Sequence, residues 1–459
     1  MAHAELVKRL LDSEMWKSAT LTRSELDKIA TRERVGLITA LFYAVGSEDE
    51  AFLLRIGLDE RRWRQAQTLG ANAFISRITD VRFVYRRGQY LVRLTFANGE
   101  NVFLSPQTWR RLVPGKTPRE RFENFARLFS DLVKVDFEKR RIEPYRIRED
   151  VETARKLLDE NNAVVLVCEG LGYDATRYDP VYLLARFVPF IASLLEKQHD
   201  TVAINPRFHQ AWVTNPDTGK SFLAEYLCHV FGWRLTAEPP TRAYLVYDGG
   251  RKRAGIVAYA NGIVMSEVDK WRNKQRVREL EAVLLDGMEQ GVWTAGVSGG
   301  FRVTRCIPIV FTANVEEYTG DSRGDLAKLF ANCGFNPKPL VERIAFPVVV
   351  TNMPRATDCI PRDKTRQRFL RVEVIRGVVA ELQRRLDETP CIRIDSLRGR
   401  VRVHAERIGA VLRVLFPNAD EQTLKTASGW FATKGWLDSE TAERLFESEL
   451  QRLEERESS

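Results

Sequence analysis

The most constraining feature of this sequence is a series of short, apolar, β-branched runs between about residues 160 and 360. The runs are AVVLVCEG, QAWVT, AGIVAYANGIVMSE, IPIVFTAN and FPVVVTN, and amphipathic segments such as DPVYLLARFVPFIASLLEK and QRVRELEAVLLDGME separate them. Apolar strands that alternate with helices are typical of a parallel sheet that is covered on both faces. The sequence therefore predicts an α/β fold, with each of the five runs as a buried strand.

The regions on either side of this core have different patterns. The first 75 residues read as helices, residues 81–105 as a three-stranded meander, residues 106–135 as amphipathic helices and residues 138–150 as a charged linker. After about residue 360 the chain reads as helical, and FATKGWLD resembles the wing of a winged helix. We predict three domains: a basic N-terminal α+β domain over 1–160, the α/β core over 161–360, and a helical lid and C-terminal region over 361–459.

Charge favours a polyanionic partner. The 459 residues include 71 Lys and Arg against 62 Asp and Glu, and 28 of the bases against 21 of the acids lie in the first 150 residues. A positive surplus of this kind attracts nucleic acid, although it is weak support by itself. No apolar run is long enough for a membrane span, and the N-terminus has no apolar signal core. We therefore expect a cytoplasmic protein.

The first chemical motif is WVTNPDTGKSFLAEYL, in which an apolar strand runs through a loop into a helix. In such a loop the N–H groups and the helix N-terminus face an anion, Lys220 contacts phosphate, and the Ser221 hydroxyl binds Mg²⁺. The alternative is an ordinary β–α turn, since Thr214 replaces a glycine and Asp217 would repel an anion unless it points outward. The candidate nucleotide-binding residues are Pro216, Asp217, Thr218, Gly219, Lys220 and Ser221.

Three further signals follow buried strands or precede them. Glu267 and Asp269 come after the run AGIVAYANGIVM, where open α/β sheets bind ligands, and such acids orient water or hold metal. Asn314 ends IPIVFTAN and can point an amide at a phosphate. Arg343 precedes FPVVV and could reach the nucleotide of a neighbouring subunit. The alternatives are a solvated helix cap for the acids, a turn for Asn314 and a surface ion pair for Arg343.

The order of these signals resembles a known family. Residues 211–358 are similar to the AAA+ module of minichromosome maintenance (MCM) helicases, which belong to the pre-sensor-1 hairpin superclade with magnesium-chelatase and MoxR-like ATPases. TNPDTGKS sits where those helicases have a GDPG(T/V)AKS loop, and AGIVAYANGIVMSEVDKW matches their second acidic motif. LLDGMEQGVWTAGVSGGFRVTRCIPIVFTAN resembles their helix, hairpin and strand ending in asparagine, and LVERIAFPVVVTNMPRATD resembles their arginine-finger segment.

The resemblance implies ATP and Mg²⁺ as cofactors. It makes Lys220 and Ser221 the phosphate and metal ligands, and Glu267 the carboxylate that polarises water and can also contact the metal. It gives Asn314 the sensor-1 role and Arg343 the role of a finger that acts on the next subunit of a ring, expected to be a hexamer. On the C-terminal helix, Arg402 is the first choice for a second sensor arginine, with Arg407 next.

Departures from that pattern leave a second interpretation open. Ser266 stands where the family has a metal-binding aspartate, and Thr214 and Asp217 replace loop glycines. The favoured hypothesis is an ATP-hydrolysing ring motor on DNA, of the helicase or translocase type, in replication or in a mobile element. The alternative is a degenerate AAA+ scaffold or switch that binds DNA or protein with little or no hydrolysis.

DNA contacts are expected at two places. The hairpin over residues 290–306 has Arg302 and Arg305 where helicases carry a gripping lysine. In the N-terminal third, Arg86 and Arg87 belong to a segment in which cations and aromatic residues alternate, which suits phosphate contact with base stacking. The alternative there is a basic, solvated face. A protein partner, as for the chelatase and MoxR relatives, is a further possibility.

Overall fold

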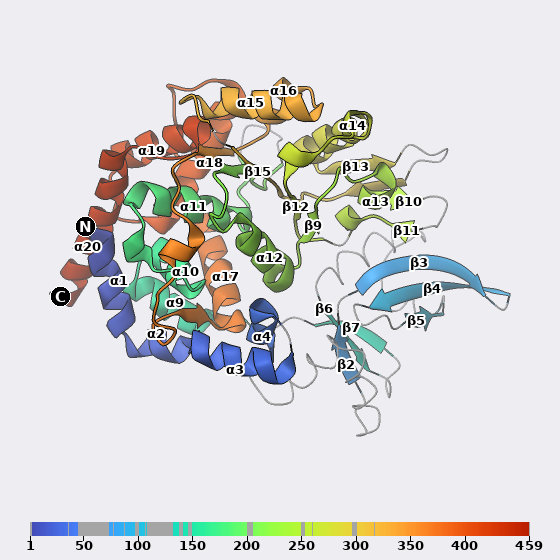
Figure 1. Cartoon of the computed structure of the whole chain (residues 1–459), viewed down its shortest axis with the longest axis horizontal. Coiled ribbons are helices and arrows are strands. Elements are labelled where there is room, and N and C mark those ends of the chain that lie inside the picture. Colours follow the sequence, from blue (N-terminus) through green and yellow to red (C-terminus); the bar gives the residue numbers. More distant parts are fainter. Residues whose placement is uncertain are drawn as a thin grey trace.

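The computed structural model describes most of the chain. The described residues are 2–34, 36–44, 73–76, 78–86, 88–96, 101–105, 107, 132–136, 141–145, 149–199, 205–248, 253–258, 260–295, 301–315 and 317–458. Figure 1 shows a body of helices and sheet on one side and the smaller blue strands on the other.

The centre of the body is a five-stranded sheet in which every pair of neighbours is parallel. Its order is β16 (Phe346–Val350), β8 (Gln210–Thr214), β15 (Ile309–Asn314), β12 (Ile263–Met265) and β9 (Arg234–Thr236). The strands β16, β8, β15 and β12 are buried along nearly their whole length because helices cover both faces of the sheet. The predicted α/β fold with a parallel core is confirmed.

Alternate side chains of each strand enter two separate hydrophobic cores. Trp212 and Val310 face the core that contains α11 (Pro180–Ser193) and α12 (Lys220–Phe231). Val213 and Phe311 face the other core, with α14 (Lys274–Gln290), α15 (Ser322–Cys333) and α16 (Pro337–Glu342). Side chains of the sheet thus pack against helices on both faces. This packing fixes the carboxyl ends of β8, β12 and β15 relative to one another.

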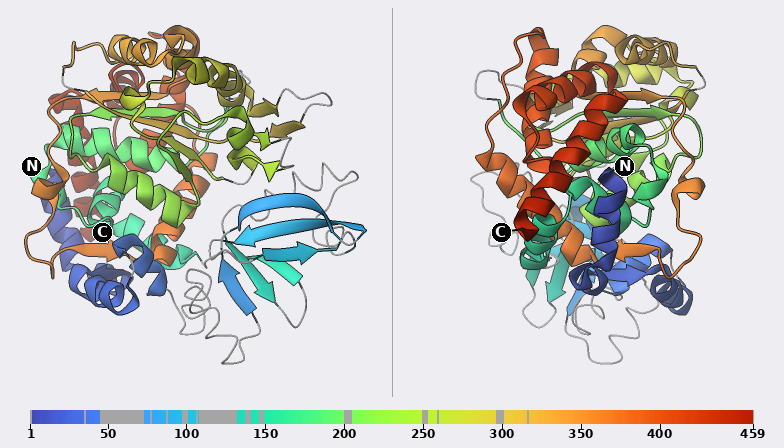
Figure 2. Two further views of the ribbon diagram at one scale, coloured as in Figure 1. Left: turned by 45° about the vertical axis from the view of Figure 1, so that its right-hand side comes forward. Right: turned by 90° about the vertical axis from the view of Figure 1, so that its left-hand side faces the viewer.

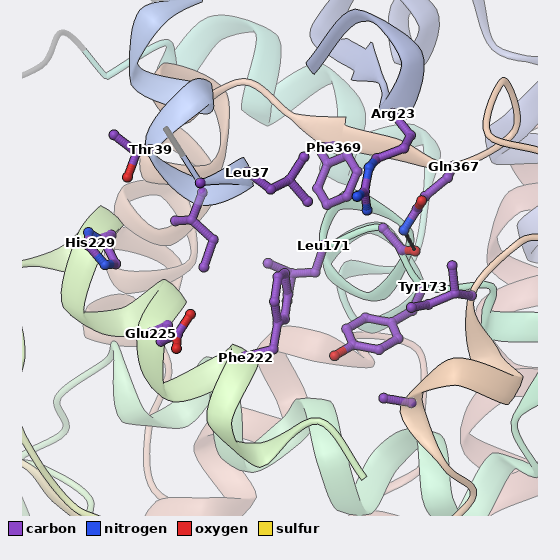
Figure 3. Close-up of a pocket in the computed structure, with 15 residues that line it drawn as sticks. Arg23, Leu37, Thr39, Leu171, Tyr173, Phe222, Glu225, His229, Gln367 and Phe369 are labelled. Atoms are coloured by element: carbon purple, nitrogen blue, oxygen red, sulfur yellow. Dashed lines mark hydrogen bonds between the residues drawn. The ribbon is translucent and has the colours of Figure 1, made fainter. Parts of the chain in front are cut away.

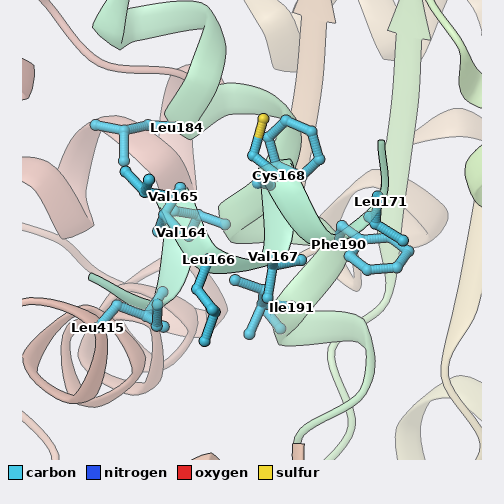
Figure 4. Packing of buried hydrophobic residues seen from close by; sticks show 14 of the residues in the cluster. Val164, Val165, Leu166, Val167, Cys168, Leu171, Leu184, Phe190, Ile191 and Leu415 are labelled. Carbon is cyan, nitrogen blue, oxygen red and sulfur yellow. The ribbon is translucent and has the colours of Figure 1, made fainter. Parts of the chain in front are cut away.

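One predicted strand is a helix. AVVLVCEG forms α10 (Ala163–Gly170), and all eight of its residues are buried. The Asn162 side chain caps it by accepting hydrogen bonds from the N–H groups of Val164 and Val165 at 2.9 and 3.3 Å. Figure 4 shows its side chains packed among α11 and the C-terminal helices. A helix that is enclosed on all sides has no polar face, so its pattern is the same as that of a buried strand.

The run AGIVAYANGIVMSE is only partly a strand. It begins in β11 (Arg253–Ala254), passes through the 3₁₀ turn η2 (Ile256–Ala258), and reaches the sheet only at β12. The hairpin predicted after α14 is present as β13 (Val292–Ala295) and β14 (Phe301–Thr304).

The remaining elements of the core are short. They are α13 (Arg242–Leu245), β10 (Tyr247–Asp248), η1 (Ala175–Arg177), η3 (Val268–Lys270) and η4 (Ala356–Cys359).

The N-terminal strands form two antiparallel sheets. The predicted meander is confirmed as β3 (Ile78–Arg86), β4 (Gln89–Phe96) and β5 (Asn101–Leu104), and β11 joins its edge through Arg253 and Arg82. A second sheet consists of β2 (Ala73–Ser76), β6 (Leu132–Asp136) and β7 (Arg141–Tyr145). This sheet corrects three predictions, because β2 begins within the first 75 residues, which were expected to be helical, β6 lies in a second segment expected to be helical, and β7 lies in the expected linker. The helices predicted over 106–131 lie almost wholly outside the described residues.

The first 44 residues pack against the end of the chain. They form α1 (Ala2–Asp12), α2 (Glu14–Ala19), β1 (Thr20–Thr22), α3 (Arg23–Glu33) and α4 (Leu37–Tyr43). β1 pairs with β17 (Arg368–Leu370), and Figure 2 shows the blue helices beside the red C-terminal helix. Leu6 and Leu10 of α1 are buried in the same core as Phe446 of that helix. The domain boundaries at residues 160 and 360 stay predictions, but these first helices contact the C-terminal region.

Apart from β17, the regular elements of the C-terminal region are helices among its described residues. It contains α17 (Val372–Glu388), which packs on α9 (Val151–Glu160), followed by α18 (Gly399–Leu415), α19 (Glu421–Lys434) and α20 (Ser439–Glu457). The predicted wing is wrong. FATKGWLD contains the end of α19, a left-handed Gly435 with φ 74° and the Asp438 side chain that caps α20. A glycine stop followed by a capping aspartate is a helix–turn–helix signal that the wing interpretation overlooked.

Candidate nucleotide-binding site

The loop between β8 and α12 lies at the carboxyl edge of the central sheet. β8 ends at Thr214 and α12 begins at Lys220, with Gly219 at φ 87° just before the helix. A Cβ on Gly219 would lie 2.6 Å from the Tyr173 hydroxyl and 3.2 Å from Cβ of Ala356, so only glycine fits. The first N–H groups of α12 have no partners within the helix and point toward this loop. The geometry suits an anion.

Asp217 does not block the loop. Its backbone is left-handed, with φ 61°, and its side chain is exposed, as is that of Pro216. The Asp217 carbonyl accepts a hydrogen bond from the Ala356 N–H at 2.8 Å. The residue therefore keeps the backbone conformation that glycine adopts most easily, and its carboxylate lies in solvent rather than among the loop N–H groups.

The Lys220 ammonium is held by oxygens of the loop. It donates to Thr214 Oγ1 at 2.8 Å, to the Asn215 carbonyl at 3.0 Å and to Thr218 Oγ1 at 3.3 Å. The Thr214 and Thr218 hydroxyls are themselves 2.6 Å apart. Thr214, which replaces a glycine, thus supplies a ligand for the lysine. Burial, together with the neighbouring Arg186 guanidinium, lowers the pKa of Lys220 to about 8.

Asn314 lies beside the start of the loop. It is the last residue of β15 and pairs in register with Thr214, the last residue of β8. Its N–H donates to Asp269 Oδ1 at 3.2 Å, and the next residue, Val315, donates its N–H to the Thr214 carbonyl at 3.2 Å. The predicted residue is therefore placed where its side chain can contact a group bound in the loop.

The acids follow β12, the next strand of the sheet. Glu267 has a left-handed backbone, with φ 51°, and donates its N–H to Thr312 Oγ1 at 3.2 Å. Its half-exposed carboxylate pairs with Lys270. Ser266 accepts a hydrogen bond from Thr312 Oγ1 at 3.4 Å. The left-handed backbone at Glu267 ends β12 at the carboxyl edge of the sheet, which is also the edge of the phosphate loop.

The oxygen groups at this edge match the chemistry of a magnesium site. Ser221, the second residue of α12, is exposed. Glu267 and Asp269, which follow β12, lie at the same edge of the sheet. Both carboxylates are close enough to Lys220 to raise its pKa. Hydroxyl and carboxylate oxygens are the donors that Mg²⁺ prefers, with water and phosphate completing its shell.

Arg343 lies at the opposite edge of the sheet. It follows α16 and precedes Phe346, which pairs with Gln210 at the amino end of β8, about 13 Å along the strand from the loop. Its guanidinium binds the Glu289 carboxylate and donates to the Pro339 carbonyl at 2.7 Å. Burial is the main cause that lowers the pKa of Arg343. It is too far from the loop of its own chain to contact a nucleotide there.

The two candidates for a second sensor arginine also lie away from that loop. Arg407 is fully buried, donates to the Pro206 carbonyl and lies 4.5 Å from the centre of the Phe208 ring, at the amino end of β8. Arg402 is half-exposed, 3.9 Å from Glu406. The same helix, α18, contacts the Arg343 region through Arg400, which pairs with Glu289. Neither candidate is placed to contact a nucleotide bound to its own subunit.

The hairpin arginines differ from each other. Arg302 is exposed on β14. Arg305 donates to the Ala260 carbonyl at 2.7 Å and to Asn261 Oδ1 at 3.2 Å, so its guanidinium holds the turn before β12. This structural role accounts for the position of Arg305, and its contact with DNA stays a prediction.

Aromatic and basic side chains meet on the meander. Tyr85 and Tyr90 are 66% and 64% exposed, and their ring centres are 5.0 Å apart across β3 and β4. Arg86 lies 5.0 Å over the Phe103 ring of β5. Arg87 is outside the described residues. The arrangement offers exposed rings beside a cation, as a base-stacking surface requires.

A cavity of about 310 Å³ borders the phosphate loop. Figure 3 shows Phe222 at its centre, with Glu225 and His229 of α12 on one side and Tyr173 on the other. Leu171, Gln367 and Phe369 complete its wall together with five residues of the N-terminal segment, among them Arg23, Leu37 and Thr39. Tyr173 and Ala356 line this cavity and also lie against Gly219, so the cavity is adjacent to the loop.

Sequence analysis missed two parts of this site. The cavity combines residues from positions 23–39, 171–173, 222–229 and 356–369, which no local pattern brings together. Arg186, in the middle of α11, lies beside Lys220 and is 6% exposed. An arginine within a strongly apolar helical segment was the available signal, because an unpaired charge is rarely buried without a role.

Among the described residues, no helix combines the length and apolar character needed to cross a bilayer.

Comparison with known proteins gives a family match that covers most of the chain. A family described as "Lon-like protease BrxL-like, ATPase domain" matches residues 136–429. The chain is similar to "Uncharacterized protein ORF426" of Acidianus filamentous virus 1, with 28% identity over 406 residues, 81% of this chain and 88% of the relative. It is also 30% identical over 184 residues to "Uncharacterized protein 440" of Sulfolobus islandicus rod-shaped virus 1, which covers 37% of this chain and 40% of the relative.

The family match includes the parallel sheet, the phosphate loop, the strand ends that carry Glu267 and Asn314, and the segment of Arg343. The chain therefore belongs to the family of BrxL-like ATPase domains, which are Lon-like and related to the AAA+ ATPases.

Proposed function

We propose that the protein binds ATP with Mg²⁺ and hydrolyses it between the subunits of a ring that moves along or remodels DNA. The observation that carries the proposal is the meeting of Lys220, Asn314 and Glu267 at one edge of the sheet while Arg343 lies at the other. The first three residues suit a nucleotide of the same chain. Arg343 can contact only the nucleotide of a neighbour.

The phosphate loop and the adjoining cavity together have the extent of a nucleotide. Lys220 and the first N–H groups of α12 would bind the phosphates. The apolar cavity of about 310 Å³, with the Phe222 ring at its centre, has room for a nucleoside. Ser221 would hold Mg²⁺, and a bound Mg²⁺ ion would neutralise negative charge on the phosphates. Asp269 and Glu267 are the carboxylates available to complete that site.

Hydrolysis needs a water to be oriented toward the terminal phosphate. Glu267 is the candidate for accepting its proton, because its carboxylate is half-exposed at the edge where the loop lies. Asn314 would contact the water or the terminal phosphate from the adjacent strand end. Arg343 of the next subunit would exchange its Glu289 partner for the charge that develops on the transferred phosphate.

The DNA-directed part of the proposal depends on the N-terminal third. Its excess of basic residues and the exposed Tyr85, Arg86 and Tyr90 support nucleic-acid contact. The hexameric ring, the likeness to MCM helicases and the role in replication or a mobile element also belong to this proposal. The family description includes the words "Lon-like protease", but the match is to its ATPase domain, and the proposal concerns that domain alone.

The test is ATP turnover and mass of the full chain, with and without single-stranded DNA. K220A and E267Q should each lower turnover at least 100-fold, and K156A, an exposed lysine on α9, serves as the matched control. DNA affinity should fall steeply with salt. Turnover that survives both substitutions would exclude this mechanism, and affinity without salt dependence would favour a protein substrate.

A second candidate function is a switch that binds nucleotide with little hydrolysis. Two observations favour it: Ser266 offers no carboxylate for metal, and Glu267 is paired with Lys270. It predicts tight ATP·Mg²⁺ binding with turnover that is unaffected by E267Q. A scaffold without nucleotide predicts no binding at all, so a titration identifies the scaffold, and the turnover of wild type against E267Q separates the motor from the switch.

A further inference from the structure

We infer that Arg186 is a second phosphate ligand, which holds the same phosphate group of the nucleotide as Lys220 does, within one subunit. The inference rests on the proposed nucleotide binding and adds a residue to it. Neither the phosphate-loop motif nor the position of Arg186 in the sequence assigns it this role.

Arg186 is a buried cation without an anion. Its side chain is 6% exposed, and no carboxylate among the described residues pairs with it. Its Nη2 atom is buried and has no hydrogen-bond partner in the described part of the chain. Burying a charge without a counter-charge is strongly unfavourable, so such a group is expected where an anionic ligand supplies the missing partner.

The guanidinium is held in one orientation. Its Nη1 donates to the Tyr178 hydroxyl, and its Cζ lies 5.2 Å from the centre of the Tyr178 ring and 5.6 Å from that of the Tyr173 ring. The Tyr173 hydroxyl lies so close to Gly219 of the phosphate loop that a Cβ there would be 2.6 Å from it. The two rings attract the cation and limit the orientations of its side chain.

Arg186 and residues of the phosphate loop line one small cavity. Arg186, Lys220, Thr214 and Thr218 line a cavity of about 20 Å³, which is room for about one water or one phosphate oxygen. In this structure the Lys220 ammonium binds the loop oxygens instead. A phosphate that draws Lys220 away from those oxygens would place one oxygen between the two cations.

The charges around Lys220 support this arrangement. Arg186 lies beside Lys220 at one small cavity and is close enough to interact with its charge, as are Asp269, Asp217 and Glu267. Two buried cations at the N-terminus of α12 repel each other in the absence of an anion. An anion bound between them would remove that repulsion and also accept hydrogen bonds from both.

The test compares R186Q with the wild-type full chain by thermal unfolding and by titration with ADP, ATP, AMP and inorganic phosphate. A lost charged hydrogen bond to phosphate should weaken ADP and ATP about 10- to 100-fold and leave AMP nearly unchanged. The melting temperature without ligand should stay equal or rise, because a buried, unpaired charge is removed. R186K should recover part of the affinity.

The matched control is R323Q. Arg323 is also buried but donates to the carbonyls of Val341, Ile344 and Ala432, so its loss should lower the melting temperature without a selective effect on ADP. If R186Q behaves like R323Q, Arg186 is structural and the inference is wrong. Y178F is a second test variant, because it removes the hydroxyl that orients the Arg186 guanidinium. Its affinity for ADP should be several-fold lower than that of the wild type.

The remaining outcomes separate this inference from the proposed function. If K220A abolishes ADP binding while R186Q and Y178F leave it unchanged, only the inference fails. If the wild type binds neither ADP nor ATP, the proposed function fails first. A larger rise in melting temperature with inorganic phosphate than with ADP at equal concentration would assign the two cations to a free anion and overturn the link to the nucleotide.

Discussion

Asn314 and Thr214 end two neighbouring parallel strands in register, so the amide of one lies beside the first residue of the phosphate loop. The Asn314 N–H is fixed by Asp269 Oδ1 at 3.2 Å. The side chain is therefore held at the one edge of the sheet where a phosphate and a water could both be within its reach.

Replacement of Asn314 by alanine should lower ATP turnover about 100-fold, because one positioned donor is lost, and change ATP affinity less than threefold. Steady-state turnover and a separate nucleotide titration distinguish the two effects. N332A, an exposed asparagine on α15, is the control. Equal turnover in N314A and wild type would contradict the role.

ADP affinity should fall as pH rises above about 8, by about tenfold per pH unit. The free protein loses the Lys220 proton near that pH, while bound phosphate favours the charged lysine and raises its pKa. The charged groups that face this lysine are Arg186, Asp217, Glu267 and Asp269. Titrations from pH 7 to 10 test this. K220R should show no such dependence, and a flat wild-type profile would refute the link.

Substitution of Asp217 by glycine should stabilise the fold by about 1 kcal/mol, because the backbone there is left-handed with φ 61°. Nucleotide affinity should rise a few-fold as an exposed carboxylate leaves the neighbourhood of the loop. Thermal unfolding and ADP titration measure the two effects. D217N removes only the charge, so it should raise affinity with little gain in stability; a less stable D217G would show that the side chain itself supports the loop.

R343A should lower turnover about 1000-fold and leave nucleotide affinity unchanged, because in the proposed function the arginine acts on the nucleotide of a neighbouring subunit. Its own loop is at the opposite edge of the sheet. Mixing R343A with K220A subunits, each inactive alone, should restore part of the ATP turnover, since some interfaces then combine an intact loop with an intact arginine. No recovery in mixed assemblies would place Arg343 outside the reaction.

The stability of the protein should fall between pH 5 and pH 8 because of Glu169. Burial raises the pKa of this carboxyl to about 8, so the folded protein keeps a proton that the unfolded chain loses above about pH 4.5. E169Q should therefore be more stable than wild type at pH 8, on the order of 3 kcal/mol, and equal to it at pH 5. Thermal unfolding at both pH values tests this, with exposed E160Q as control. A difference that is the same at both pH values would point to packing instead.

The core of the fold could be predicted because its strands are apolar on both faces and short. QAWVT, IPIVFTAN and FPVVVTN are strands as expected, and the polar residues at their ends, such as Asn314, follow from that placement. The role of each polar residue remains a prediction, because register fixes where a side chain begins and not what it binds.

Other elements could not be predicted, for physical reasons that differ. AVVLVCEG is a helix because tertiary contacts enclose it completely, which removes the polar stripe that marks a helix in sequence. β7 reads as a charged linker because its neighbour β6, rather than its own composition, makes it a strand. The walls of the cavity come from segments more than 100 residues apart, such as residues 23–39 and 356–369, and Arg186 meets Lys220 only through the packing of α11 on α12, which single-sequence patterns do not relate.

The pairing of β1 with β17 has a consequence for synthesis of the protein. Thr20 bonds across to Leu370, so the first strand leaves the ribosome some 350 residues before its partner exists. During that interval the face of α1 that packs on α20 stays uncovered, and the cavity wall that Leu37 and Phe369 provide together cannot be completed. In the proposed function, nucleotide can therefore bind fully only to a chain that has been translated past β17, and stalled or shortened chains should be recognised by chaperones instead.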